Sequence, residues 1–143
     1  MIKNVRHTGI VAGNLQRMVK FYIALGFLEE SRAIETGAYI EKVVNLDGVE
    51  VEWVKMRAPD GFLLELLQYR SHPQSPKISL ANANDLGCSH VAFTVDEIEK
   101  ACELICENGG KITNSPAISP NGKVKVAYCH DPEGVLMELV QEL

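Results

Sequence analysis

The sequence predicts an α+β fold made of two copies of one module, each with the element order β-α-β-β-β. Two observations carry this prediction. The stretches Asp60–Leu67 and Glu133–Val140 share one pattern, in which an acidic residue and Gly precede three apolar residues, one Glu and two more apolar residues. Upstream of each stretch, His7 and His90 each open a strand-like run that leads into an amphipathic helical pattern. A chain of 143 residues has room for one ordinary domain that contains both modules.

The first module covers residues 1–70, and its elements follow from local signals. His7–Val11 reads as a strand, and Asn14 is a good N-cap for a helix that stops at Gly26. The segment 37–46 suits a short helix better than a strand, and it makes this module the longer of the two. Pro59 and the Asp60–Gly61 pair then mark a turn into the last strand.

The second module covers residues 86–143 and repeats this order. His90–Val95 reads as a strand, a helix begins near Asp96 and stops at Asn108–Gly110, and the final strand follows the turn at Pro132. Residues 71–85 are rich in Ser, Pro and Asn, which is typical of a surface linker. We therefore expect a single domain, 1–143, with two modules joined by this linker.

Composition limits the classes of function. The net charge is −5, and this argues against nucleic acid as the main partner because phosphate binding needs clustered cations. No stretch approaches the roughly 20 apolar residues of a membrane span, and the N-terminus lacks the apolar run of a signal peptide. We expect a cytoplasmic protein without a membrane partner, whose four cysteines are reduced and buried as small apolar side chains.

Glu65 and Glu138 are the chemical oddity of the sequence. Each has apolar neighbours on both faces of its strand, so we expect both carboxylates to be buried and therefore paired, protonated or bound to metal. A single Glu of this kind is more often paired with Arg or Lys, and a single strand His is more often structural. Two of each at equivalent positions favour one shared site, in which His7, Glu65, His90 and Glu138 converge if the modules pack about a pseudo-twofold axis. Two imidazoles and two carboxylates suit one divalent ion such as Zn, Ni, Co, Mn or Fe(II). The other two histidines, His72 and His130, are assigned to the linker surface and to a turn.

The motifs of both halves resemble those of the glyoxalase, bleomycin-resistance and extradiol-dioxygenase superfamily, also called vicinal oxygen chelate proteins. The motifs that carry the resemblance are His7–Ile10, Phe21–Tyr22, Leu25–Phe27, Leu64–Leu66, His90–Phe93, Gly109–Gly110, Asp131–Gly134 and Met137–Leu139. The resemblance implies paired βαβββ modules that form a cupped, partly open mixed sheet around a central metal. It also implies that the metal ligands are His7, Glu65, His90 and Glu138, and that the protein is a homodimer.

The glyoxalase I-like subgroup fits best, which implies a metal-dependent lyase or isomerase. Its small-molecule substrate would carry vicinal oxygens, and a proton would move next to a carbonyl through a metal-bound enediolate. Glu138 is the first candidate for the base and Glu65 the second. Two alternatives stay open: an Fe(II) extradiol dioxygenase and a non-catalytic small-molecule binding or resistance protein. Val11 and Tyr69 stand where glyoxalase I has its glutathione-binding Arg and Asn. Four cations are interpreted as solvated surface charge, with a role toward a different anionic substrate as the alternative: Arg57, Arg70, Lys123 and Lys125.

Overall fold

The computed structural model describes residues 1–73, 80 and 82–143, and the chain divides into two compact units, Met1–Pro76 and Lys77–Leu143. Each unit contains a mixed sheet with a helix packed on it, which confirms the predicted α+β class. Residues 74–79 and 81, which belong to the predicted linker, lie outside the described residues. No helix within the described ranges is long and apolar enough to cross a membrane.

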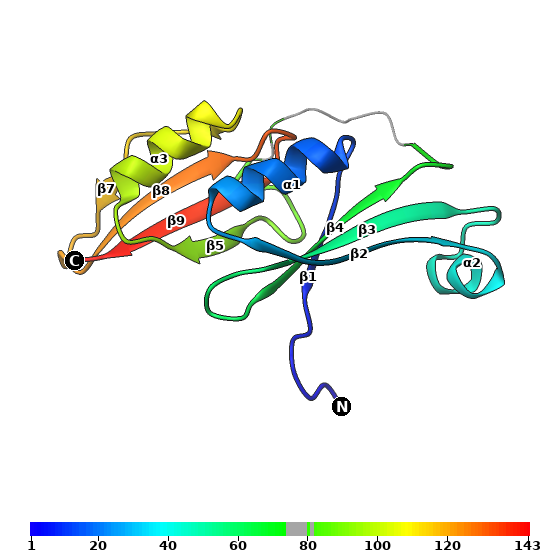
Figure 1. Cartoon of the computed structure of the whole chain (residues 1–143). Coiled ribbons are helices and arrows are strands. Elements are labelled where there is room, and N and C mark those ends of the chain that lie inside the picture. The colour runs from blue at the N-terminus through cyan, green and yellow to red at the C-terminus, as the bar shows by residue number, and fades with distance from the viewer. Residues whose placement is uncertain (74–79, 81) are drawn as a thin grey trace. The chain divides into compact units, whose positions relative to one another are not determined.

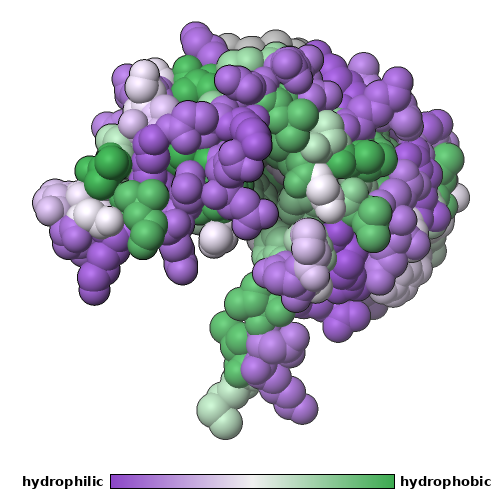
Figure 2. Space-filling model, turned by 60° about the vertical axis from the view of Figure 1, so that its left-hand side comes forward, coloured by the Kyte–Doolittle hydropathy of each residue, from purple (hydrophilic) through white to green (hydrophobic). Residues whose placement is uncertain are grey.

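The N-terminal unit forms a four-stranded sheet in the order β1-β4-β3-β2 (Figure 1). Its elements in chain order are β1 (Thr8–Val11), α1 (Leu15–Ala24), β2 (Leu28–Thr36), α2 (Ala38–Val44), β3 (Glu50–Arg57) and β4 (Leu63–Tyr69). The edge strand β1 pairs with β4 in parallel, and the other pairs are antiparallel. The short helix predicted within 37–46 is confirmed as α2. Before β1 the chain projects away from the sheet and carries exposed apolar side chains, Met1, Ile2 and Val5 among them (Figures 1 and 2).

Helix α1 begins where the sequence predicts, because the Asn14 side chain accepts a hydrogen bond from the N–H of Arg17 at 3.0 Å. Its buried side is an apolar stripe at helical spacing that includes Leu15, Met18 and Tyr22. The chain leaves the helix through Gly26 at a φ of 97°, a left-handed backbone conformation that Gly adopts without strain. The stripe packs on one face of the sheet, where Leu64 and Leu66 of β4 are fully buried.

The strands of the N-terminal unit therefore have two different faces. On β4 and β3, the residues Leu64, Leu66 and Val54 point to the helix side and are fully buried. The alternate residues Glu65 and Lys55 point to the opposite face and are only half-buried. This second face carries the predicted ligands of the unit.

The C-terminal unit repeats the plan with a sheet in the order β5-β9-β8-β6, and β7 pairs with β8 outside this path. Its elements are β5 (Val91–Thr94), α3 (Ile98–Glu107), β6 (Lys111–Ile112), β7 (Ala117–Ile118), β8 (Val124–His130) and β9 (Leu136–Glu142). Helix α3 buries Ile98 and Ile105, and Figure 1 shows it lying over β8 and β9. The side chain of Glu97, the residue before α3, makes no capping hydrogen bond.

A glutamine caps the main helix of each unit in the same way. Gln68 on β4 accepts a hydrogen bond from the N–H of Leu15 at 3.3 Å, and Gln141 on β9 accepts one from the N–H of Ile98 at 2.8 Å. Each glutamine stands three residues after the Glu that the two halves share, in Glu-Leu-Leu-Gln and Glu-Leu-Val-Gln. The internal repeat therefore includes the contact that ties each helix to its sheet.

The expectation of four buried cysteines is wrong. Cys129 on β8 is fully buried, but Cys88 and Cys106 are exposed and Cys102 is intermediate. Cys102 and Cys106 are four residues apart and share a face of α3, yet the buried stripe of this helix is too narrow to cover both. Burial raises the pKa of the Cys129 thiol to about 12.

Candidate metal centre

His7 and Glu65 meet on the open face of the N-terminal sheet. The parallel register of β1 and β4 places Gly9 opposite Glu65, so His7, two residues earlier, lies on the same side of the sheet. The imidazole Nε2 of His7 lies 3.3 Å from Oε2 of Glu65. The side chains are 33% and 16% exposed, so solvent reaches both groups.

His90 and Glu138 form the equivalent pair in the C-terminal unit. Ala92 of β5 lies opposite Glu138 of β9, and His90 again precedes it by two residues. The Nε2 of His90 lies 3.0 Å from Oε2 of Glu138, while Nδ1 of the same ring lies 2.6 Å from the hydroxyl of Ser89. The ring also contacts Tyr128 edge to face, with the centroids 5.1 Å apart. Both ring nitrogens of His90 therefore have defined partners, which fixes the orientation of the imidazole.

The prediction that Glu65 and Glu138 are buried is wrong, because their side chains are 16% and 22% exposed. Leu64 and Leu66 are buried against α1, whereas Leu63 and Leu67, which share the face of Glu65, are half-buried. An apolar run on both faces of a strand was interpreted as covered on both sides, but here one face stays partly open. Glu65 and Glu138 are therefore accessible to a ligand, and each is already paired with an imidazole.

The geometry of each pair suits two neighbouring ligands of one metal ion. Metal–nitrogen and metal–oxygen bonds of about 2.0 to 2.2 Å place adjacent donor atoms about 2.9 to 3.4 Å apart at angles from octahedral to tetrahedral. The two observed Nε2–Oε2 separations, 3.3 and 3.0 Å, fall in this range. Across residues 1–73, 80 and 82–143, no group of three or more His, Cys, Asp or Glu side chains is arranged to hold a metal. Each unit thus carries one pair of an imidazole and a carboxylate.

The remaining residues suggested by the sequence lie elsewhere or are occupied. His72 is half-buried, with its Nδ1 2.7 Å from the hydroxyl of Ser71, and His130 is buried at the end of β8. Three of the four suggested cations form ion pairs: Arg57 with Glu30, Arg70 with Glu52, and Lys125 with Glu99. The fourth, Lys123, is exposed.

Two polar residues that the sequence interpretation missed lie directly across from the paired carboxylates. In the β3–β4 register Lys55 is opposite Glu65, and in the β8–β9 register Tyr128 is opposite Glu138. Each stands ten residues before its Glu, so the two are equivalent in the internal repeat. A comparison of the two halves at that offset is the signal that would have found them.

The sequence profile described as Glyoxalase/Bleomycin resistance protein/Dioxygenase superfamily matches residues 4–139. The chain belongs to this superfamily. The match covers both His–Glu pairs, and it confirms the resemblance suggested by the motifs.

Individual members of the superfamily match along nearly the whole chain. A lactoylglutathione lyase of Escherichia coli O157:H7 is 26% identical over 143 residues, which cover 95% of this chain and 90% of the relative. A glyoxalase family protein from Bacillus cereus, also 26% identical, superimposes with a TM-score of 0.91 over 100% of this chain and 96% of its own. Glyoxalase I from Zea mays has a TM-score of 0.66 at 22% identity and shares the fold over 96% of this chain and 46% of its own.

Proposed function

We propose that the protein is a metal-dependent, glyoxalase-like lyase or isomerase that moves a proton next to a carbonyl of a small substrate. The observation that carries the proposal is the presence of the same His–Glu pair on the open face of both sheets. The lactoylglutathione lyases among its relatives support a lyase-type activity. We propose that the two half-sites, His7 with Glu65 and His90 with Glu138, together hold one divalent ion. They would come from one chain or from the two chains of a homodimer.

The donor set suits Zn, Ni, Co or Mn, because two imidazoles and two carboxylates are ligands of borderline or hard character. When bound, such an ion would polarise the vicinal oxygens of the substrate and stabilise negative charge on them. The protein groups then have separate tasks. The imidazoles bind as neutral rings, and Ser89 holds the ring of His90 in one orientation.

Glu138 is the proposed base, and its surroundings distinguish it from Glu65. Glu138 lies opposite the neutral phenol of Tyr128, whereas Glu65 lies opposite the ammonium of Lys55. In this proposal Glu138 takes the proton from the carbon next to the carbonyl and returns it on the neighbouring carbon, while Glu65 stays a metal ligand. Its partial exposure lets the carboxylate reach a substrate on this face.

Elemental analysis of protein purified without chelator tests the metal site. We expect about one transition-metal ion per complete set of four ligands in the wild type, and loss of the ion in His90→Ala. The matched control is His72→Ala, which removes a half-buried histidine outside both pairs and should keep the metal. Equal metal content in His90→Ala and the wild type would refute the four-ligand site.

Turnover separates the base from the ligands. With the hemithioacetal of methylglyoxal and mercaptoacetate, a small thiol acid, as substrate, Glu138→Gln should lose about 10²–10⁴-fold in kcat while it keeps most of its metal. Glu65→Gln should lose metal affinity at least as much as turnover. If Glu138→Gln loses metal and turnover in the same proportion, Glu138 acts only as a ligand. If iron is the bound ion and a catechol gives a ring-opened product under oxygen, the dioxygenase alternative replaces the lyase. Tight binding of a small molecule by metal-free protein, with no turnover in any assay, would favour the binding protein.

A further inference from the structure

Lys55 is the cation best placed to meet a substrate in the N-terminal unit. One row of residues runs across the open face of the sheet, from Ser31 on β2 through Lys55 on β3 to Glu65 on β4. Directly opposed residues of an antiparallel pair have Cβ atoms about 4.5 to 5.5 Å apart. A ligand of a few atoms that reaches Glu65 is therefore within reach of the Lys55 ammonium.

The position of the ammonium is defined by its neighbours. Its Nζ lies 4.8 Å from the centroid of the Trp53 ring, a cation–π contact between residues two apart on one strand face. The indole N–H of Trp53 donates a hydrogen bond of 2.8 Å to Oε1 of Glu35, which keeps the ring in place. The ammonium is thus held over a fixed aromatic surface.

Lys55 has no anionic partner among the residues that the structure describes. The ion pairs found there join other side chains, and the nearby cation Arg57 is already bound to Glu30 at 2.6 Å. A half-buried lysine on the face of a candidate active site, with no carboxylate of its own, is suited to bind an anion from outside. The equivalent position in the other half holds neutral Tyr128, so the repeat itself does not require a cation here.

We propose that Lys55 binds a carboxylate of the substrate, with the hydroxyl of Ser31 beside it as a further donor. This inference rests on the proposed function and names its substrate class. The substrate is a small acid whose carboxylate lies within a few bonds of the reacting carbon, because Lys55 and Glu65 are nearest neighbours across the strands. Glutathione conjugates, with carboxylates far from the reacting carbon, do not match this arrangement.

Trp53 provides a direct reading of the site because it is the chain's one tryptophan and lies beneath the Lys55 ammonium. Titrations of Trp53 emission would use lactate, which has a carboxylate beside a hydroxyl, and its neutral amide, lactamide. They would be run on metal-free and on zinc-loaded protein, with calorimetry as the second measurement. The variants are Lys55→Met, Lys55→Arg and the control Lys42→Met, which removes an exposed lysine on α2.

We expect saturable binding of lactate to the wild type and to Lys42→Met, weakened about tenfold or more in Lys55→Met and largely restored in Lys55→Arg. Lactamide should bind to the wild type about tenfold more weakly than lactate does. In Lys55→Met the two ligands should bind with equal affinity. Equal affinities of the wild type for the two ligands, no response to lactate, or an unchanged lactate affinity in Lys55→Met would each overturn the proposal.

The two proposals fail in different ways. Lactate binding that depends on Lys55, in a protein that takes up no metal, would refute the proposed function and leave the anion site standing. The opposite outcome is that Lys55→Met takes up metal as the wild type does and turns over anionic and neutral substrates at the wild-type rates. That result would refute the role of Lys55 and leave the proposed function standing.

Discussion

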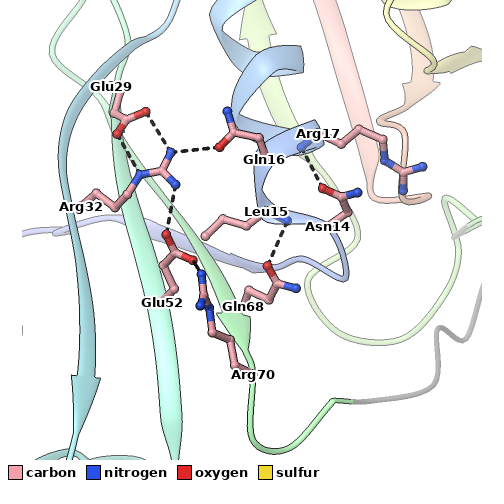
Figure 3. A network of polar contacts seen from close by, with 9 residues as sticks. All are labelled: Asn14, Leu15, Gln16, Arg17, Glu29, Arg32, Glu52, Gln68 and Arg70. Atoms are coloured by element: carbon pink, nitrogen blue, oxygen red, sulfur yellow. Dashed lines mark hydrogen bonds and ion pairs between the residues drawn. The ribbon is translucent and has the colours of Figure 1, made fainter.

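Glu52 is the most deeply buried carboxylate of the N-terminal unit, and it allows a sharp prediction about stability. It lies on β3, on the helix side of the sheet, and is 6% exposed. Figure 3 shows that Arg32 and Arg70 approach it from two sides, and Arg32 donates to its Oε1 at 3.0 Å. Burial raises the pKa of Glu52, but the hydrogen bonds from Arg70 and Arg32 outweigh it and hold the pKa below its usual value.

The arginines are much more exposed than the carboxylate that they hold. Their side chains are 31% and 45% exposed, against 8% for Glu52. Loss of Glu52 leaves two cations that water can solvate, whereas loss of both arginines leaves a charge buried without a partner. We expect Glu52→Leu to lower the free energy of unfolding by about 1 kcal/mol, and Arg32→Met with Arg70→Met to lower it by about 3 to 5 kcal/mol. Each single Arg→Met change should cost only about 1 kcal/mol, because the other arginine remains.

Urea unfolding between pH 4 and 8 would test this asymmetry. In the wild type the pKa of Glu52 is lowered by folding, so its stabilisation is present above the unfolded value and is lost as the pH falls through the folded value. In the double arginine variant, burial without a partner raises the pKa, so the deficit in stability should shrink as the pH falls from about 7 to 5. Additive single changes, or a deficit that does not depend on pH, would refute the reasoning.

Two further predictions concern the helix contacts and the thiols. Gln141→Ala should lower the free energy of unfolding by about 1 kcal/mol, and Gln68→Ala by a similar or smaller amount, because the hydrogen bond to Gln141 is shorter, 2.8 against 3.3 Å. Urea unfolding would measure both changes, with the exposed Gln16→Ala as the control. In native protein at about pH 8, iodoacetamide should modify exposed Cys88 and Cys106 and spare buried Cys129, whose pKa is about 12. Mass spectrometry after digestion would identify the modified cysteines, and modification of Cys129 before the other two would contradict the prediction.

The repeat made much of the fold predictable. Periodicity and capping signals predicted α1 correctly from Asn14, and the pattern from Gly37 to Leu46 predicted α2, because these signals are local in sequence. The start of α3 was placed near Asp96 instead of at Ile98, since its first turn is capped from β9 by Gln141, which is distant in sequence. The pairing of His7 with Glu65 and of His90 with Glu138 agrees with the matching positions that the sequence suggested. The degree of burial could not be predicted, because apolar residues on both faces of a strand do not reveal whether both faces are covered.

The two halves share the residues at some positions of the repeat and differ at others, and the shared positions have a different physical role from those that differ. The positions kept are the His, the Glu and the Gln three residues after it, which form the candidate half-site and attach the helix. The position opposite the Glu differs, with a lysine in one half and a tyrosine in the other. A metal that takes equivalent donors from both halves favours symmetric ligands, whereas a substrate with unlike ends needs unlike groups around it. The lysine in the N-terminal unit and the tyrosine in the C-terminal unit therefore give the two His–Glu pairs different chemical surroundings, one with a cation and one without.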